Sequence, residues 1–517
     1  MKKHSLRKFL ALVLPSAMLL GAVGCTKEEV IDYDFTVSYD QIETANISSG
    51  VSVHDPSILK VGDTYYIYGS HMTAATSTDL LNWTKLADGY STSNSVYGQI
   101  YSVRDEAFAY AGSNTSLIPT DDGGVHVWAP DVIYNETTGL YYMYYCTTST
   151  WIASNLCYGV SESPEGPFEW KGALIYSGFD MDTLSATNVL DYVSEDYVQA
   201  NYIKSGSYNY ESCPNAIDPS VFYDEDGRMW MVYGSWSGGI FLLELDPATG
   251  ECIHPEADEE NNVDPYFGKR LVGGTHKSIE GPYILYTGGY YFLFVSYGSL
   301  NREGGYQIRV YRSETVDGTY VDMNGFNHSA GNNEYYGLKL SGNYYLPSQE
   351  YAYMATGHNS ALEDDDGKLY IVHHTRFDNG TEYHSPRVHQ FLLNQEGWPC
   401  MLPYQTQGET VSETGYDTDE IVGRYYVINQ GTDISAEIAE PVILYLEKSG
   451  KVTGESVSGT WTQEKGTYYM TITIDDQTYS GVFCAMTDEA GAAVMTFSAV
   501  GSNQSVWGVK YVESAED

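Results

Sequence analysis

Three carboxylic acids stand directly before turn-forming residues and short apolar runs. Asp55 and Asp218 each precede a proline, and Glu280 precedes Gly281-Pro282. Because Asp and Pro are common in turns, a turn explains any one of these acids taken alone. Three acids in similar settings point to chemistry. One carboxyl group can donate a proton, a second can accept one, and a third can hold the donor protonated by charge repulsion.

The acids open repeated segments that are typical of β-hairpins. A polar residue is followed by a short apolar strand, a Gly turn and an alternating aromatic strand. Asp-Gly and Gly-Gly turns between alternating runs are strong hairpin signals. The polar starts fall at Asp55, about Asp131, Asp218, Glu280 and His358. This spacing leaves room for two more strands per unit, and it predicts a five-bladed β-propeller over residues 46–405.

In a propeller the innermost strands begin around a central channel. We therefore expect Asp55, Asp218 and Glu280 to converge on one axial cavity, with His358 added from the fifth blade. Three carboxylates gathered without work to do would be costly through like-charge repulsion. The repeat thus predicts an active site at the axis.

The repeat ends near residue 405, and a second domain is expected after it. Residues 410–517 contain short alternating runs such as Tyr468-Tyr469-Met470-Thr471-Ile472. They predict a small C-terminal β-barrel or sandwich, so the whole chain is expected to be all-β. Six cysteines follow Cys25 without any metal-binding spacing, and Cys146 and Cys157 are either paired or free and buried.

The composition narrows the range of partners. The formal net charge is −43, although charged residues make up only 18% of the chain. An acidic surface repels nucleic acid and anionic lipid, so we expect a neutral substrate or a cation. The 49 Tyr and 9 Trp suit β-strands, and they also offer flat faces on which sugar rings can stack. The protein is expected to be a monomer.

The N-terminus has the pattern of an export signal. Four basic residues precede an apolar stretch at residues 9–20 that is too short to span a bilayer. Ala22-Val23-Gly24-Cys25 then resembles a bacterial lipobox, although the usual Leu is Ala22 here. The resemblance implies a signal peptide at 1–24, a lipidated Cys25 and a tether at 25–45. The acidic residues after Cys25 resemble the surface-export signals of Bacteroides-type lipoproteins, which implies a cell-envelope location at the outer membrane or cell surface.

Five sequence blocks, taken together, resemble glycoside hydrolase family 43 across residues 50–405. The blocks are His54-Asp55-Pro56, Trp128-Ala129-Pro130-Asp131, Asn215-Ala216-Ile217-Asp218-Pro219, residues 276–283 and Gly357-His358-Asn359. The third block, Gly234-Ser235-Trp236-Ser237-Gly238 and the C-terminal domain resemble the endo-acting α-1,5-L-arabinanases. The Gly234–Gly238 stretch is one residue shorter than the arabinanase form, which leaves the shape of the cleft open.

The resemblance implies cleavage of plant cell-wall arabinan, or a related pentose polysaccharide, with inversion. Asp55 is then the general base, Glu280 the general acid, and Asp218 the residue that adjusts the pKa of the acid. In inverting enzymes the acid and the base lie about 6.5–9.5 Å apart, with room for a water molecule between them.

Four other residues have less specific roles. The resemblance places His358 at a metal ion in the central channel, usually Ca²⁺. A lone His is more often a hydrogen-bonded core residue, and Ca²⁺ prefers oxygen ligands. Trp128 either stacks on a sugar or covers the entrance to a blade. Asn215 and Ser235 either bind sugar hydroxyls or serve in turns.

Other functions stay open at this point. An exo-acting α-L-arabinofuranosidase or β-xylosidase of the same fold would need a groove closed at one end. A surface glycan-binding lipoprotein without catalysis would not need all three acids. A structural propeller that binds proteins predicts no axial acids.

Overall fold

The computed structural model describes residues 33–111, 126–327 and 335–511. The predicted signal peptide and Cys25 lie outside these residues. The chain divides into the compact units Met1–Phe35 and Thr36–Asp517, and every element named below belongs to the second unit. Its longest helix, α3 (Glu195–Asn201), has seven residues. Among the described residues, none of the helices has the length and hydropathy needed to cross a membrane.

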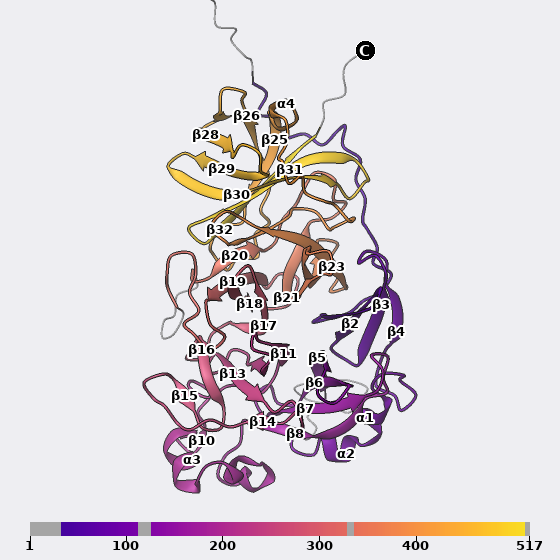
Figure 1. Cartoon of the computed structure of the whole chain (residues 1–517), viewed down its shortest axis with the longest axis vertical. Coiled ribbons are helices and arrows are strands. Elements are labelled where there is room, and N and C mark those ends of the chain that lie inside the picture. The colour runs from indigo at the N-terminus through magenta and orange to yellow at the C-terminus, as the bar shows by residue number, and fades with distance from the viewer. Residues whose placement is uncertain (1–32, 112–125, 328–334, 512–517) are drawn as a thin grey trace, which may run out of the picture. The chain divides into compact units, whose positions relative to one another are not determined.

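Five β-sheets form the blades of a propeller (Figure 1). The first blade contains β1 (Ser57–Val61), β2 (Thr64–Gly69), β3 (Thr73–Ser77) and β4 (Thr84–Ala87), and the second contains β5 (His126–Asn135), β6 (Leu140–Thr148), β7 (Ser154–Ser161) and β8 (Glu169–Ser177). The third contains β11 (Ser220–Tyr223), β12 (Met229–Tyr233), β13 (Ile240–Leu245), β14 (Cys252–Ile253), β15 (Val263–Asp264) and β16 (Gly268–Val272). The fourth contains β17 (Glu280–Thr287), β18 (Tyr290–Tyr297), β19 (Gln307–Ser313) and β20 (Leu338–Ser341), and the fifth contains β21 (Tyr353–Glu363), β22 (Leu369–Phe377), β23 (His384–Leu393) and β24 (Pro399–Met401).

The prediction of a five-bladed propeller is confirmed. The second strand of each blade is buried along most of its length, because the neighbouring blades cover both of its faces. The cores therefore lie between blades. Tyr66 and Tyr68 of the first blade, for example, share one cluster with Met143 and Tyr145 of the second.

Short elements occupy the longer connections between blades. They are α1 (Gly98–Ser102), α2 (Arg104–Ala107), η1 (Leu184–Ala186), η2 (Val189–Asp191), α3, β9 (Ile203–Lys204) and β10 (Ser207–Tyr208). The six cysteines at 146, 157, 213, 252, 400 and 484 are all free, so the alternative of a Cys146–Cys157 disulfide is wrong.

The C-terminal domain is a closed barrel of eight antiparallel strands, which confirms the predicted second β-domain. Its strands follow chain order around the barrel: β25 (Gly423–Asn429), β26 (Val442–Leu446), β27 (Lys451–Gly454), β28 (Ser458–Gln463), β29 (Tyr469–Ile474), β30 (Gln477–Thr487), β31 (Ala493–Gly501) and β32 (Gln504–Lys510). The helix α4 (Thr418–Ile421) precedes them. Large side chains such as Trp461, Phe483 and Phe497 pack together in its core.

The barrel packs directly onto the propeller. One apolar cluster contains Trp507 and Val482 of the barrel together with Phe294 and Phe391 of the fourth and fifth blades. Residues 36–45, which belong to the predicted tether, also contact folded parts of the chain. Tyr426 of the barrel donates a hydrogen bond to the carbonyl of Ser38.

Candidate active site

Each innermost strand has one residue with a left-handed backbone at the central channel, either just before the strand or within it. The φ angles are 52° at Asp55, 40° at Ala129, 57° at Asp218, 57° at Gly281 and 46° at His358. Pro follows four of these residues and Asn follows the fifth. Such a backbone costs a non-glycine residue about 1–3 kcal/mol and is concentrated at functional sites. The fold therefore holds Asp55, Asp218 and His358 at strained and equivalent positions.

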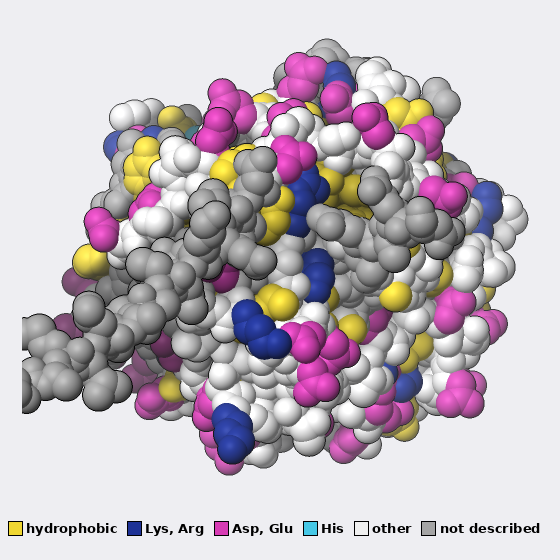
Figure 2. All heavy atoms as spheres, turned by 90° about the horizontal axis from the view of Figure 1, so that it is seen from above, with side chains coloured by type: hydrophobic (Ala, Val, Ile, Leu, Met, Phe, Trp, Pro, Cys, Tyr) yellow, Lys and Arg dark blue, Asp and Glu magenta, His cyan; other side chains and the backbone are white. Residues whose placement is uncertain are grey.

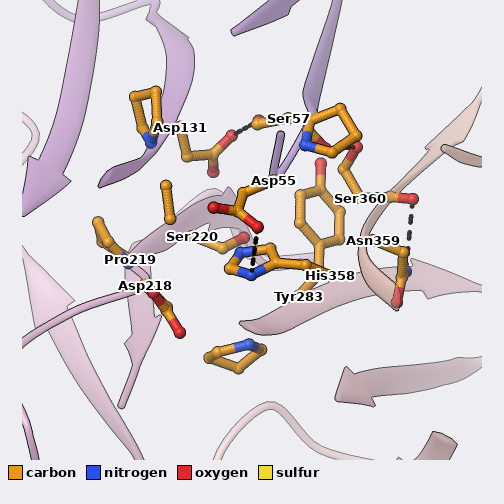
Figure 3. A pocket seen from close by; sticks show the side chains of 14 residues that line it. Asp55, Ser57, Asp131, Asp218, Pro219, Ser220, Tyr283, His358, Asn359 and Ser360 are labelled. Atoms are coloured by element: carbon orange, nitrogen blue, oxygen red, sulfur yellow. Dashed lines mark hydrogen bonds and ion pairs between the residues drawn. The ribbon is translucent and has the colours of Figure 1, made fainter. Parts of the chain in front are cut away.

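These five entry points enclose an axial cavity. It is lined by equivalent triplets from the five blades: Asp55-Pro56-Ser57, Ala129-Pro130-Asp131, Asp218-Pro219-Ser220, Pro282-Tyr283 beside Gly281, and His358-Asn359-Ser360. Its volume of about 20 Å³ holds roughly one water molecule. Figure 3 shows Asp55 facing His358 within this ring.

In the second and fourth blades, the predicted acids Asp131 and Glu280 do not occupy the position equivalent to Asp55. The counterpart of Asp55 in the second blade is Ala129, and in the fourth blade it is Gly281. Bulges lie at this point in β5, β17 and β21 alike, and the acids are offset because Asp131 follows the left-handed residue of its blade by two positions whereas Glu280 precedes that of its blade by one. Glu280 consequently lines the groove above the channel and is absent from the lining of the axial cavity.

Asp131 lies deeper in the axial cavity. Its carboxylate accepts hydrogen bonds from the backbone N–H groups of Val221 (2.6 Å) and Val132 (3.0 Å) and from the Ser57 hydroxyl. Burial raises the pKa of Asp131 to about 6. These contacts tie neighbouring blades together, so Asp131 is a structural residue of the channel.

A groove of about 1020 Å³ lies above the axial cavity and contains all three predicted acids. Its lining also includes four further residues singled out from the sequence: Trp128, Asn215, Ser235 and His358. The predicted meeting of Asp55, Asp218 and Glu280 is therefore confirmed, although the place where all three meet is the groove.

Asp55 is surrounded by donors. Its Oδ2 lies 2.7 Å from His54 Nδ1 and accepts from the Ser70 hydroxyl, while its Oδ1 lies 3.1 Å from His358 Nδ1. His374 Nδ1 lies 3.6 Å from Oδ1 but accepts from the Asp55 backbone N–H at 3.3 Å. Burial would raise the pKa of Asp55, but His358 and His54 outweigh it and hold that pKa well below its usual range. Asp55 is thus an ionised carboxylate, able to accept a proton.

Asp218 has the opposite environment. Burial raises the pKa of Asp218 well above its usual range, and repulsion from Glu280 and Asp55 raises it further. The backbone N–H of Gly281, at 3.2 Å from Oδ2, opposes the shift only weakly. Asp55 and Asp218 therefore differ in protonation, although they occupy equivalent positions.

Glu280 is held by three side-chain donors. Trp236 Nε1 donates to Oε2 at 2.6 Å, Ser235 Oγ donates to the same oxygen at 3.2 Å, and the Tyr306 hydroxyl donates to Oε1 at 2.7 Å. Ser235 therefore contacts the acid. The sequence assigned no role to Trp236, although it stands in the Gly234–Gly238 stretch, and Tyr306 was missed because it lies in a loop without a repeated motif.

Asn215 positions an aromatic residue of the groove. Its amide donates to the carbonyl of Trp151 at 2.7 Å and accepts from the Ser177 hydroxyl at 3.3 Å. Trp151 is 54% exposed and lies 5.3 Å from Trp128, measured between ring centroids. Asn215 therefore holds the loop of Trp151, and the two indoles form an aromatic wall of the groove.

Histidines beside Asp55 were also missed. His54, Asp55 and His374 present metal-ligating atoms within 4.8 Å of one another. However, the two imidazoles stack at 4.2 Å with an interplanar angle of 19°, and both direct Nδ1 toward Asp55. We assign them as a frame that holds the carboxylate. His374 carries no sequence signal beyond its place at the end of a buried strand.

The axial cavity suits a hard cation in its donor chemistry. The Asn359 Oδ1 atom is buried without a hydrogen-bond partner, and Ser220 and the acids Asp55, Asp131 and Asp218 line the same space. Ca²⁺ prefers such oxygen ligands. Because Nδ1 of His358 contacts Asp55, only its Nε2 is left for a metal.

The outer surface matches the acidic composition. Figure 2 shows Asp and Glu side chains spread over one face of the molecule, with fewer Lys and Arg between them.

Known proteins share this fold and sequence. Residues 46–206 and 192–399 match the model of glycosyl hydrolases family 43, and residues 403–508 match its C-terminal lipocalin-like domain. The extracellular endo-α-(1→5)-L-arabinanase 2 of Bacillus subtilis is 36% identical, covering 92% of this chain and 96% of the relative. The corresponding enzyme of Thermotoga petrophila is 38% identical, covering 89% and 94%. Its crystal structure superimposes with a TM-score of 0.77 and 37% identity, covering 91% of this chain and 100% of that chain. The chain belongs to glycosyl hydrolases family 43, and it is a glycosidase.

Proposed function

We propose that the protein cleaves internal α-1,5-L-arabinofuranosidic bonds of arabinan with inversion. The observation that carries this proposal is the pairing of an ionised Asp55 with a hydrogen-bonded Glu280 in one groove. Two relatives that cover nearly the whole chain carry the name endo-arabinanase, which supports the choice of substrate.

In this mechanism Asp55 activates a water molecule. Its carboxylate takes a proton from the water, whose oxygen attacks the anomeric carbon from the face opposite the leaving sugar. His54 and His358 keep the carboxylate ionised and fix its orientation. General-base catalysis of this kind contributes about 10²–10⁴-fold to the rate.

Glu280 donates the proton to the leaving oxygen. Trp236 and Tyr306 bind one carboxylate oxygen each, so the orientation of the acid is fixed before substrate arrives. Asp218 is adjacent in the groove, and two neighbouring carboxylates resist a second negative charge. The pair therefore retains one proton at a pH where isolated carboxyl groups have lost theirs.

The groove supports binding of an internal stretch of polysaccharide. Its lining includes Trp128, Trp151, Tyr210, Leu300, Asn301 and His384. Aromatic faces suit the apolar faces of sugar rings. Arabinan is uncharged, which also agrees with the acidic surface.

Product profiling on linear arabinan tests the proposal. We expect oligomers of mixed length from the earliest times and a fall in viscosity ahead of the rise in reducing ends. Arabinose alone from the start would contradict endo action. Glu280→Gln is the matched control, and turnover within tenfold of the parent would show that another residue is the acid.

An exo-acting enzyme is the second candidate. An extracellular exo-α-(1→5)-L-arabinofuranosidase from Cellvibrio japonicus is 30% identical over 68% of this chain. Release of a single short product from one chain end would favour this alternative. A non-catalytic glycan-binding role would require both the parent and Glu280→Gln to bind arabinan without cleaving it.

We also propose that one Ca²⁺ ion binds in the axial cavity, with His358 Nε2 and Asn359 Oδ1 as its protein ligands. When bound, the ion would offset the charge of the axial carboxylates. Equilibrium dialysis with metal analysis should give one Ca²⁺ per chain for the parent and less for Asn359→Ala. Equal metal content in both proteins would remove Asn359 from the site.

The protein is further proposed to act at the cell surface as a lipid-anchored monomer. The Ala22–Cys25 pattern supports lipidation of Cys25, and the relatives described as extracellular support export. Detergent partitioning of the full chain compared with Cys25→Ala tests the anchor. Partitioning of both proteins into the aqueous phase would contradict it.

A further inference from the structure

Tyr306 lies behind the acid and outside the lining of the groove. Its hydroxyl donates to Glu280 Oε1 at 2.7 Å, and its side chain is 1% exposed. The ring stacks on His374 with centroids 5.7 Å apart, and His374 in turn faces Asp55. On its other side, a Cβ at Gly357 would come within 2.3 Å of the ring, so the phenol fills a slot with no spare room. Tyr306 thus contacts Glu280 directly, and it also contacts His374, which lies beside Asp55.

The residues on both sides of Tyr306 are held by the C-terminal barrel. Gly305 packs against Ser435, where an added Cβ would meet the Ser435 carbonyl oxygen at 2.8 Å. Gln307 Nε2 donates to the carbonyls of Gly305 and Asp433, at 3.1 Å each. The chain that carries Tyr306 is therefore fixed to residues 432–435 of the barrel domain.

Two buried cations strengthen this contact. Arg309 donates to Gln307 Oε1 through Nε (2.9 Å) and Nη2 (2.7 Å), and to the Thr432 carbonyl. Lys339 Nζ donates to the Asp433 carbonyl at 3.0 Å. Arg309 is fully buried and Lys339 is 5% exposed. Buried charges are costly unless they are hydrogen-bonded. The barrel supplies the acceptor of Lys339 and part of the acceptors of Arg309, which also donates to the Tyr336 carbonyl of the propeller at 3.1 Å.

The loop that joins β18 to β19 and carries Tyr306 is also anchored at its other end. Ser278 Oγ accepts from the backbone N–H of Gly298 at 2.6 Å and donates to its carbonyl at 2.8 Å. Between the two anchors, Ser299, Leu300 and Asn301 line the groove. The barrel contact thus supports a wall of the groove as well as the tyrosine behind it.

We propose that the C-terminal barrel is a positioning element of the active site. Its segment 432–435, bound by Gln307, Arg309 and Lys339, holds Tyr306 against Glu280. The barrel therefore acts on catalysis without touching the substrate. The inference rests on Glu280 being the acid, as proposed above.

A double-mutant cycle tests this coupling. Tyr306→Phe removes the hydroxyl and keeps the ring, while Arg309→Met removes the donors to the barrel. We expect each substitution to lower kcat about tenfold with little change in KM, because an acid must stay within hydrogen-bond reach of its target. If Arg309 acts through Tyr306, the double variant should be no slower than Tyr306→Phe, since coupled residues are not additive.

The pH profile provides a readout that a purely structural role would not move. Loss of a hydrogen-bond donor to the Glu280 carboxylate favours its protonated form. The basic limb of the pH profile of kcat should therefore shift to higher pH in both single variants. Arg309→Lys retains a donor and should restore part of kcat. Lys339→Met, which removes another donor to the same segment, serves if Arg309→Met does not fold, and it is expected to lower kcat in the same sense.

Glu489→Gln is the matched control, because Glu489 lies at another contact between the barrel and the propeller, beside Tyr353. It should leave kcat and its pH profile unchanged. Additive losses in the cycle, or a lower melting temperature with unchanged kcat, would overturn the inference. If Glu280→Gln kept its activity, the proposed acid would fail instead, so the two failures can be told apart.

Discussion

The groove and the contact between propeller and barrel both bury carboxylates, but they partner them differently. In the groove, Asp218 lies between two other acids and is crowded by like charge. At the contact, Glu489 accepts from Tyr353, and Arg387 Nε donates to the same tyrosine hydroxyl at 2.8 Å. Buried carboxylates therefore have two uses in this protein. In the groove, where several acids crowd together, they serve proton transfer, and at the domain contact, where Glu489 has fixed hydrogen-bond partners, a carboxylate joins the barrel to the propeller.

The largest expected effect comes from removing the base. Asp55→Asn keeps the size of the side chain but replaces one acceptor oxygen with an NH2 group and cannot accept the proton, so kcat on linear arabinan should fall about 10³-fold. Steady-state kinetics and circular dichroism would show whether the loss occurs in a folded protein.

Asp224→Asn is the control for that experiment, because Asp224 is a buried acid of the third blade that lines neither the groove nor the axial cavity. Its kcat should stay close to that of the parent. A similar loss in both variants would mean that the loss of any buried carboxylate lowers kcat, and the specific role of Asp55 would fail.

At the domain contact the expected effect is on stability. Arg387→Met removes the cation that reaches Glu489 through the Tyr353 hydroxyl, and losing a hydrogen bond made by a buried charged group costs about 1.5–3 kcal/mol. We expect that loss in the free energy of unfolding at pH 8, from urea titrations. A loss below about 1 kcal/mol would contradict a paired role for the contact.

A smaller effect concerns pH. Burial raises the pKa of Glu489 to about 7, above its unfolded value of about 4.3. The native state therefore binds more protons between these values, and this group makes the protein less stable as the pH rises from about 4.3 to 7, by up to about 3 kcal/mol.

Glu489→Gln should abolish that slope and be more stable than the parent at pH 8. Melting temperatures at pH 5 and pH 8 would measure both effects. Identical pH dependence in the two proteins would show that Glu489 titrates normally in the fold.

Much of this architecture could be predicted from the repeat. The Asp-Pro entries and Gly turns recur once per blade, so they indicated both the number of blades and the meeting of the acids. The offset of Glu280 is visible once the prolines are aligned, because Gly281 stands between Glu280 and Pro282 whereas Asp55 and Asp218 directly precede their prolines. The sequence does not show, however, that this offset places Glu280 in the groove and outside the axial cavity.

The supporting residues could not be predicted for a different reason. Tyr306 reaches Glu280 from a loop without a repeated pattern, and the Thr432 carbonyl that accepts from Arg309 lies 123 residues along the chain, in the barrel domain. Only the folded chain brings Tyr306, His374 and Glu280 together.

The most direct test of the central claim is ¹H NMR of linear arabinan during the first minutes of hydrolysis. If Asp55 delivers water opposite the bond that Glu280 protonates, each α-linkage should yield a new reducing end that first appears as the β-anomer. Initial release of the α-anomer would mean retention of configuration, and it would contradict the assignment of Asp55 as a base.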